Sequence, residues 1–221
     1  MQFDVEALLF DIDGTLVDST PVVERTWNTW ASRHGLDVNA ILAVCHGRRT
    51  EDTVAEFLPE SECAAGAAEL TQLELDDLDG VVALPAVLDL LMKLPPDRWA
   101  AVTSGSQELM RARLTVAGLP IPPVLIAAED VTHGKPDPEG YMKAAAALGR
   151  TPSNCLVIED APAGLVAGLA SGARVLAVAT SQSPDVLGSA HAVIPDLTYC
   201  TIAATDTGIR VETRAREDQP T

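Results

Sequence analysis

The chain has 221 residues, of which 47% are hydrophobic and 21% are charged, a normal balance for a globular protein with a sizeable core. Its formal net charge of -17 argues against a general affinity for nucleic acid or for an anionic membrane surface. No apolar run approaches the roughly 18 to 20 residues that cross a bilayer, and the first residues lack the features of a signal peptide. We therefore expect a cytoplasmic protein with no nucleic-acid partner and no membrane partner.

The first predicted strand covers residues 5–10 and ends in two carboxylates one residue apart, Asp11 and Asp13, before Gly14. Two acids cannot lie inside a core without a cation, so we expect them at the carboxyl edge of a sheet, where open α/β folds bind ligands. Such a pair favours Mg2+, which binds through carboxylates and substrate phosphate. An ordinary Asp-Gly turn is the simpler interpretation of this stretch alone.

A block of helical pattern follows and contains no convincing strand. Its predicted helices cover residues 19–34, 39–44, 50–57 and 60–78. We expect residues 17–82 to form a separate all-helical unit, inserted after the first strand. An insertion at the functional edge of a sheet is well placed to act as a lid.

Strands alternate with helices in the rest of the chain. Predicted strands cover 99–102, 124–127, 155–158 and 174–178, and predicted helices cover 86–94, 107–117, 139–148 and 163–170. A short edge strand, Ile209–Thr213, precedes a polar tail. This alternation predicts an α/β fold with a doubly wound parallel sheet, built from residues 1–16 and 83–221.

Four segments of this α/β unit end in polar clusters of different kinds. The clusters are Asp11 with Asp13, Thr103 with Ser104, Lys135, and Glu159 with Asp160. In a parallel sheet these ends meet along one edge, and together they supply what a metal-bound phosphoryl group needs: carboxylates, hydroxyl donors and a cation. Taken singly, each has a simpler interpretation as a turn, a helix cap, a loop lysine or a solvated strand end.

In order and spacing, the four clusters resemble the four motifs of the haloacid dehalogenase superfamily, and the helical insertion resembles its C1-type cap. The resemblance covers nearly the whole chain. Three stretches, residues 46–50, 98–105 and 159–164, are similar to the glycerol-phosphate and 2-deoxyglucose-6-phosphate phosphatases of that superfamily.

The resemblance implies a role for each motif residue. Asp11 would be the nucleophile that forms an aspartyl-phosphate, and Asp13 the general acid and base. Thr103 and Ser104 would bind phosphoryl oxygens, and Lys135 would offset the charge between nucleophile and phosphate.

The resemblance also implies a metal site and a substrate loop. Asp160, the Asp11 carboxylate and the Asp13 carbonyl would hold Mg2+, with Glu159 acting directly or through water. In the cap loop, His46, Arg48 and Arg49 would reach the substrate hydroxyls. For the two arginines, surface pairing with Glu51 or Asp52 is the simpler alternative.

The implied function is hydrolysis of a small sugar or polyol phosphate. Two alternatives stay open. A phosphomutase of the β-phosphoglucomutase type would carry a histidine where this chain has Val23 and an arginine where it has Thr50. A non-catalytic phosphate sensor would be expected to have lost one of Asp11, Asp13, Lys135 or Asp160, and the chain has all four.

Overall fold

In the computed structural model, which describes residues 1–214, six parallel strands form the central sheet in the order β6–β5–β2–β7–β8–β9. These are β2 (Ala7–Phe10), β5 (Trp99–Val102), β6 (Leu125–Ile126), β7 (Cys155–Glu159), β8 (Arg174–Val178) and β9 (Ala192–Ile194). Strand β2 pairs with β5 on one side and β7 on the other, and all four of its residues are buried. The predicted doubly wound parallel sheet is confirmed, with its first strand at the centre.

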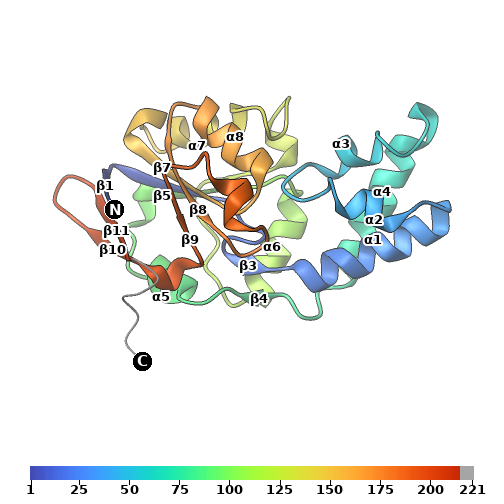
Figure 1. The fold of residues 1–221 in the computed structure, drawn as a ribbon, viewed down its shortest axis with the longest axis horizontal. Helices are drawn as coiled ribbons and strands as arrows, with labels where there is room; N and C mark the ends of the chain where they lie inside the picture. The colour runs from blue at the N-terminus through green and yellow to red at the C-terminus, as the bar shows by residue number, and fades with distance from the viewer. Residues whose placement is uncertain (215–221) are drawn as a thin grey trace.

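Helices cover both faces of this sheet (Figure 1). They are α5 (Val87–Leu91), α6 (Gln107–Val116), α7 (Glu139–Ala147) and α8 (Pro162–Ala170). Successive side chains of β2 point to opposite faces, as the strand period requires. Leu9 therefore packs in a cluster with Tyr141 of α7, whereas Phe10 packs in a second cluster with Met110 of α6. Apolar side chains therefore pack on both faces of the sheet and hold the strand ends in place.

A smaller antiparallel sheet lies at the end of the molecule that holds the N-terminus (Figure 1). It contains β1 (Gln2–Val5), β11 (Ile209–Thr213) and β10 (Cys200–Ala204), with β11 in the middle. The prediction of one strand over residues 5–10 is wrong. The strand is interrupted at Glu6, whose N–H donates to the Asn154 carbonyl at 2.7 Å, so β1 ends at Val5 and β2 begins at Ala7. The predicted strand at Ile209–Thr213 forms, but between two neighbours and not at an edge. Residues 215–221 of the expected tail lie outside the described residues.

The helical insertion lies at the opposite end of the molecule (Figure 1). Its helices are α1 (Thr20–His34), α2 (Val38–Leu42), α3 (Thr50–Val54) and α4 (Glu60–Asp76). They pack around their own apolar cluster, in which the buried Trp30 donates from Nε1 to the Gly66 carbonyl at 2.9 Å. A two-stranded ribbon joins the insertion to the α/β unit: β3 (Val17–Asp18) pairs antiparallel with β4 (Val82–Ala83). We propose, as the sequence pattern suggests, that residues 17–82 form the cap and that, of the described residues, 1–16 with 83–214 form the core; the remainder of the predicted 83–221 segment lies outside the described residues.

Short 3-10 turns complete the connections. They are Pro96–Arg98, Ala128–Asp130, Pro152–Asn154, Pro184–Leu187 and Leu197–Tyr199. Within residues 1–214, none of the helices combines the length and the apolar character needed to cross a bilayer.

Candidate active site

The polar strand ends meet at one edge of the central sheet, as the sequence predicts. The Lys135 Nζ lies 2.5 Å from Asp11 Oδ1, which follows β2, and 2.6 Å from Glu159 Oε1, at the end of β7. All three side chains are at most 8% exposed. Burial alone would lower the pKa of Lys135, but Asp11 and Glu159 outweigh it and hold that pKa above its ordinary value. The ammonium is therefore charged across the physiological range.

Three buried carboxylates lie together at this site, and two of them contact the Lys135 ammonium. Oxygen atoms of Asp11, Glu159 and Asp160 all lie within 4.8 Å of one another. Burial raises the pKa of Asp11 well above its usual range in spite of Lys135, and burial together with Glu159 raises the pKa of Asp160 to about 7. Excess negative charge with oxygen donors only is the chemistry of a site for a hard divalent cation, and these residues fit one.

A close backbone approach shapes the same site. Gly14 has φ of 78°, and a Cβ built there would lie 2.0 Å from Asp160 Oδ2. The loop after β2 can therefore reach the Asp160 carboxylate only with glycine at this position. Ser181, after β8, donates a hydrogen bond to the same atom, Asp160 Oδ2.

Both oxygens of Glu159 have partners within the protein. Oε1 accepts from Lys135 and from the Tyr141 hydroxyl at 2.7 Å, and Oε2 accepts from the N–H groups of Asp160 and Ala161 at 3.0 and 3.1 Å. These contacts anchor Lys135 beside Asp11. The expected role of Glu159 as a metal ligand stays a prediction. Tyr141 was not predicted as a site residue, because a tyrosine on the apolar face of a helix has the sequence pattern of a core residue.

Thr103 and Ser104 follow β5 and serve different contacts. Thr103 is 6% exposed, and its Oγ1 accepts from the Gly105 N–H at 3.1 Å. Ser104 Oγ donates to the Gly47 carbonyl of the insertion at 2.9 Å. Neither residue caps the next helix, because Ser106 does so by accepting from the Leu109 N–H at 3.2 Å. The Thr103 hydroxyl therefore keeps its proton for the site, whereas the Ser104 hydroxyl donates its proton to the insertion.

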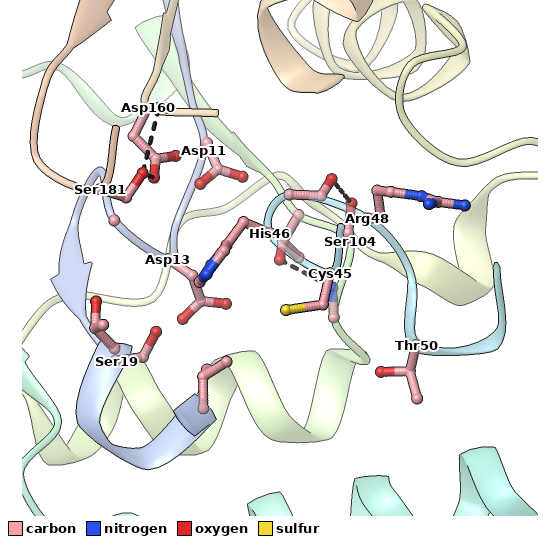
Figure 2. A pocket seen from close by; sticks show the side chains of 16 residues that line it. Asp11, Asp13, Ser19, Cys45, His46, Arg48, Thr50, Ser104, Asp160 and Ser181 are labelled. Carbon is pink, nitrogen blue, oxygen red and sulfur yellow. Dashed lines mark hydrogen bonds between the residues drawn. The ribbon is translucent and has the colours of Figure 1, made fainter. Parts of the chain in front are cut away.

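A cavity of about 90 Å³ lies between these strand ends and the insertion. Figure 2 shows Asp11, Asp13 and Asp160 along one side of it and Cys45, Arg48 and Thr50 along the other. Ser19, Thr20 and Val23 of the insertion also line it, as do Thr103 and Ser104. The loop at residues 45–50 touches the core at Ser104, so the insertion covers the site as a lid does.

The three expected substrate residues of this loop have different surroundings. His46 lines the cavity, and burial lowers the pKa of its imidazole, so it is neutral near pH 7. Arg48 also lines the cavity but pairs with Glu56 at 2.7 Å. Arg49 lies outside the lining, because it pairs with Asp52 through both Nε and Nη2 at 2.8 and 2.9 Å. The simpler alternative, local pairing with Asp52, describes Arg49.

Asp13 has a partner that sequence analysis missed. Its Oδ2 lies 2.8 Å from Nη1 of Arg113 on α6, and Nη2 of the same guanidinium lies 2.9 Å from Glu74 Oε1 on α4. A helical pattern over residues 107–117 does not distinguish one arginine from another, so no sequence signal pointed to this contact.

Comparison with known proteins identifies the fold and its chemistry. The model of the haloacid dehalogenase-like hydrolases matches residues 5–172. The chain belongs to this family. The resemblance seen in the four motifs is confirmed, and the family is one of hydrolases whose phosphatases use a divalent metal.

Several curated relatives of the chain are phosphatases. Hexitol phosphatase A of Escherichia coli is 41% identical over 92% of this chain and 96% of its own. 2-Deoxyglucose-6-phosphate phosphatase 2 of Saccharomyces cerevisiae is 34% identical over 91% and 92%. Glycerol-1-phosphate phosphohydrolase 2 of the same yeast is 32% identical over 85% and 80%.

A solved structure supports the fold alone. A hydrolase from Pseudomonas syringae superposes with a TM-score of 0.79 at 22% identity, covering 86% of this chain and 94% of that one.

Proposed function

We propose that the chain is a Mg2+-dependent phosphomonoesterase that hydrolyses a small sugar or polyol phosphate through an aspartyl-phosphate on Asp11. The observation that carries this proposal is the buried contact of Asp11 with Lys135 at 2.5 Å, beside Asp160 and at the base of a cavity covered by the insertion. The named activities of the relatives, on hexitol, deoxyglucose and glycerol phosphates, support the substrate class.

Asp11 is the nucleophile. Lys135 holds Oδ1 of its carboxylate, which leaves the second oxygen to attack phosphorus in line with the ester bond. The new bond joins the carboxylate oxygen to phosphorus as the bond from phosphorus to the ester oxygen breaks. The Lys135 ammonium and the Thr103 hydroxyl offset the charge on the phosphoryl oxygens, with backbone N–H groups near Ser104.

Asp13 moves the proton in both halves of the reaction. It protonates the leaving alkoxide as the ester bond breaks, and it then accepts a proton from the water that attacks the phosphorus of the phosphoaspartate. That second step releases inorganic phosphate and restores the Asp11 carboxylate. Asp11, Asp160 and the Asp13 carbonyl would hold Mg2+, which when bound neutralises charge between carboxylate and phosphoryl group.

The cavity favours small substrates with hydroxyl groups. At about 90 Å³ beneath the covering loop, it leaves less room for a bulky nucleoside than for a smaller polyol or sugar unit. The neutral His46 and the Arg48 guanidinium offer hydrogen bonds to hydroxyls. At the two positions that a mutase would use, Val23 and Thr50 line the cavity, which favours hydrolysis over phosphoryl transfer to a second sugar.

We also propose a cytoplasmic location and a small phosphorylated metabolite as the ligand, with no nucleic-acid or membrane partner. The four cysteines are free thiols, which suits a reducing compartment. The net charge of -17 opposes binding to polyanions.

Phosphate release from a panel of glycerol, hexitol and hexose phosphates and nucleotides, with Mg2+ or with a chelator, tests the proposal. We expect the polyol and hexose phosphates to lead, no turnover with chelator, and none in Asp11→Asn. Asp185→Asn, at an exposed residue that is not part of the cavity lining, is the matched control and should behave as wild type. Nucleotides ranking first would overturn the substrate class, and turnover by Asp11→Asn would overturn the mechanism.

A further inference from the structure

One buried arginine spans the boundary between the two units. Arg113 lies on α6 of the core, and its side chain is 3% exposed. One end of its guanidinium contacts Asp13 of the core at 2.8 Å, and the other contacts Glu74 of helix α4 in the insertion at 2.9 Å. Glu74 is itself 9% exposed, and α4 and α6 contact each other around it.

Burial of the Arg113 guanidinium costs free energy unless both carboxylates are in place to pair with it. A guanidinium removed from water needs partners, and here Nη1 and Nη2 contact carboxylates of different units, while Nε has no partner among the described residues. Withdrawal of the insertion would remove Glu74 and leave Arg113 with Asp13 alone. Arg113 therefore has both of its carboxylate partners, Asp13 and Glu74, only while α4 is docked on α6.

The same contact selects one oxygen of Asp13. Arg113 occupies Oδ2, whereas Oδ1 is buried and has no hydrogen-bond partner within the protein. Asp13 lines the covered cavity. An unpartnered buried oxygen beside a polar cavity is the atom left to exchange a proton with the substrate.

We propose that Arg113 is a positioning residue that fixes Asp13 for proton transfer, and that Glu74 makes this positioning depend on the docked insertion. The inference rests on the proposed function, since it assigns the acid and base role to Asp13. Covering of the cavity and completion of the acid and base are then one event. A substrate small enough to let the insertion dock obtains an oriented Asp13, and a larger one does not.

The test compares two leaving groups, because a purely structural role would affect both alike. Glycerol phosphate releases an alkoxide that needs a proton, whereas p-nitrophenyl phosphate releases a phenolate that does not. For Arg113→Met we expect kcat/KM for glycerol phosphate to fall about 10²-fold, the order expected when a catalytic group loses its orientation. We expect a much smaller fall for p-nitrophenyl phosphate. The loss should be in kcat, with KM for glycerol phosphate nearly unchanged.

Three further variants define the contact. Arg113→Lys keeps the charge but cannot reach two carboxylates with a planar fork, so it should restore only part of the loss. Glu74→Gln removes the charge from the insertion side and should produce a smaller loss with the same dependence on leaving group. Arg111→Met, on the exposed face of the same helix, is the matched control and should match wild type.

Folding of the variants is controlled by a charge-balanced pair. The double variant Arg113→Met with Glu74→Leu removes both charges of the buried ion pair across the boundary, so that Glu74 is not left as an unpaired buried charge. If Arg113→Met does not fold, this double variant must show the same selective loss on glycerol phosphate.

The outcomes separate the inference from the proposed function. No turnover of either ester by the wild-type protein refutes the function itself. Turnover by wild type with equal losses of kcat/KM on both esters in Arg113→Met refutes the positioning role and leaves the function intact, because kcat/KM reports the steps up to loss of the leaving group and not the later attack of water that both esters share. Faster turnover by Arg113→Met would mean that the arginine restrains Asp13, which also overturns the inference, and wild-type behaviour of Glu74→Gln would overturn the link to the insertion.

Discussion

Replacement of Lys135 by methionine removes the ammonium that contacts Asp11 and Glu159 at 2.5 and 2.6 Å while keeping an unbranched side chain only one atom shorter. Three carboxylates, including that of Asp160, then share a buried site without it. We expect a large loss of stability in the metal-free protein, together with loss of turnover.

The size of the effect follows from the burial of the pair. Removing one partner of a buried ion pair costs about 3–5 kcal/mol, and for a chain of this length that lowers the melting temperature by roughly 6–20 °C. Folding raises the pKa of Lys135 above its ordinary value of 10.5. The contribution of this lysine to stability is therefore fully present below pH 10.5 and is lost only as pH rises through the higher pKa of the folded protein. A measurement at pH 7.5 therefore records all of it.

Thermal unfolding of wild type and Lys135→Met, each with chelator and with Mg2+, is the assay. The matched control is Lys143→Met, which breaks an ion pair with Glu139 at 2.6 Å whose lysine is 46% exposed. An exposed pair contributes about 0–1 kcal/mol, so this control should melt close to wild type. Mg2+ should recover part of the loss in Lys135→Met, since it brings positive charge to the same carboxylates.

The pH dependence provides a second check on the cause. Burial raises the pKa of Asp11 and Lys135 opposes that rise, so without Lys135 the Asp11 carboxyl should bind a proton more readily when folded than when unfolded, and the variant should gain stability relative to wild type as pH falls toward 5. Equal melting temperatures for Lys135→Met and Lys143→Met in chelator would refute the electrostatic account of the site.

Three further predictions concern the same cluster. Mg2+ at 100 times its dissociation constant should stabilise the protein by about 2.7 kcal/mol in thermal unfolding, and Asp160→Asn should abolish that gain. Gly14→Ala should weaken Mg2+ binding measured by titration calorimetry, because a Cβ would lie 2.0 Å from Asp160 Oδ2; unchanged affinity would contradict the close approach. Tyr141→Phe should cost about 1–3 kcal/mol in urea unfolding by removing a buried hydrogen bond to Glu159, and a neutral result would show that Glu159 does not need it.

The site residues that could be predicted from the sequence are those that lie at the carboxyl ends of parallel strands, because the sheet topology alone brings these positions together. Asp11, Thr103 and Glu159 each follow an apolar run that can only be an interior strand, and parallel strands bring their carboxyl ends to one edge. Lys135 follows from the same argument combined with the family motif. The alternation of short strands and helices fixed the fold class for a similar reason.

The part that sequence missed depends on contacts between elements far apart in the chain. Arg113 and Glu74 are 39 residues apart on helices of different units, and their helical patterns carry no sign that the two meet. The break at Glu6 was missed because one charged residue between Val5 and the apolar run Ala7–Phe10 does not by itself end a strand, while the hydrogen bond to Asn154 that divides them is a tertiary contact. For Arg49 the sequence left contact with the substrate and local pairing as alternatives, and the structure shows the pairing with Asp52; a role toward the substrate stays a prediction.

The most direct test of the central claim is to trap the covalent intermediate. Wild-type protein mixed with Mg2+ and an excess of hexitol or glycerol phosphate is quenched in acid during turnover, and its peptides are analysed by mass spectrometry. We predict a phosphoryl group on Asp11, within the peptide that follows β2, and its absence from Asp11→Asn. Turnover without a phosphoryl group on the protein, or a phosphoryl group on a residue other than Asp11, would contradict the account.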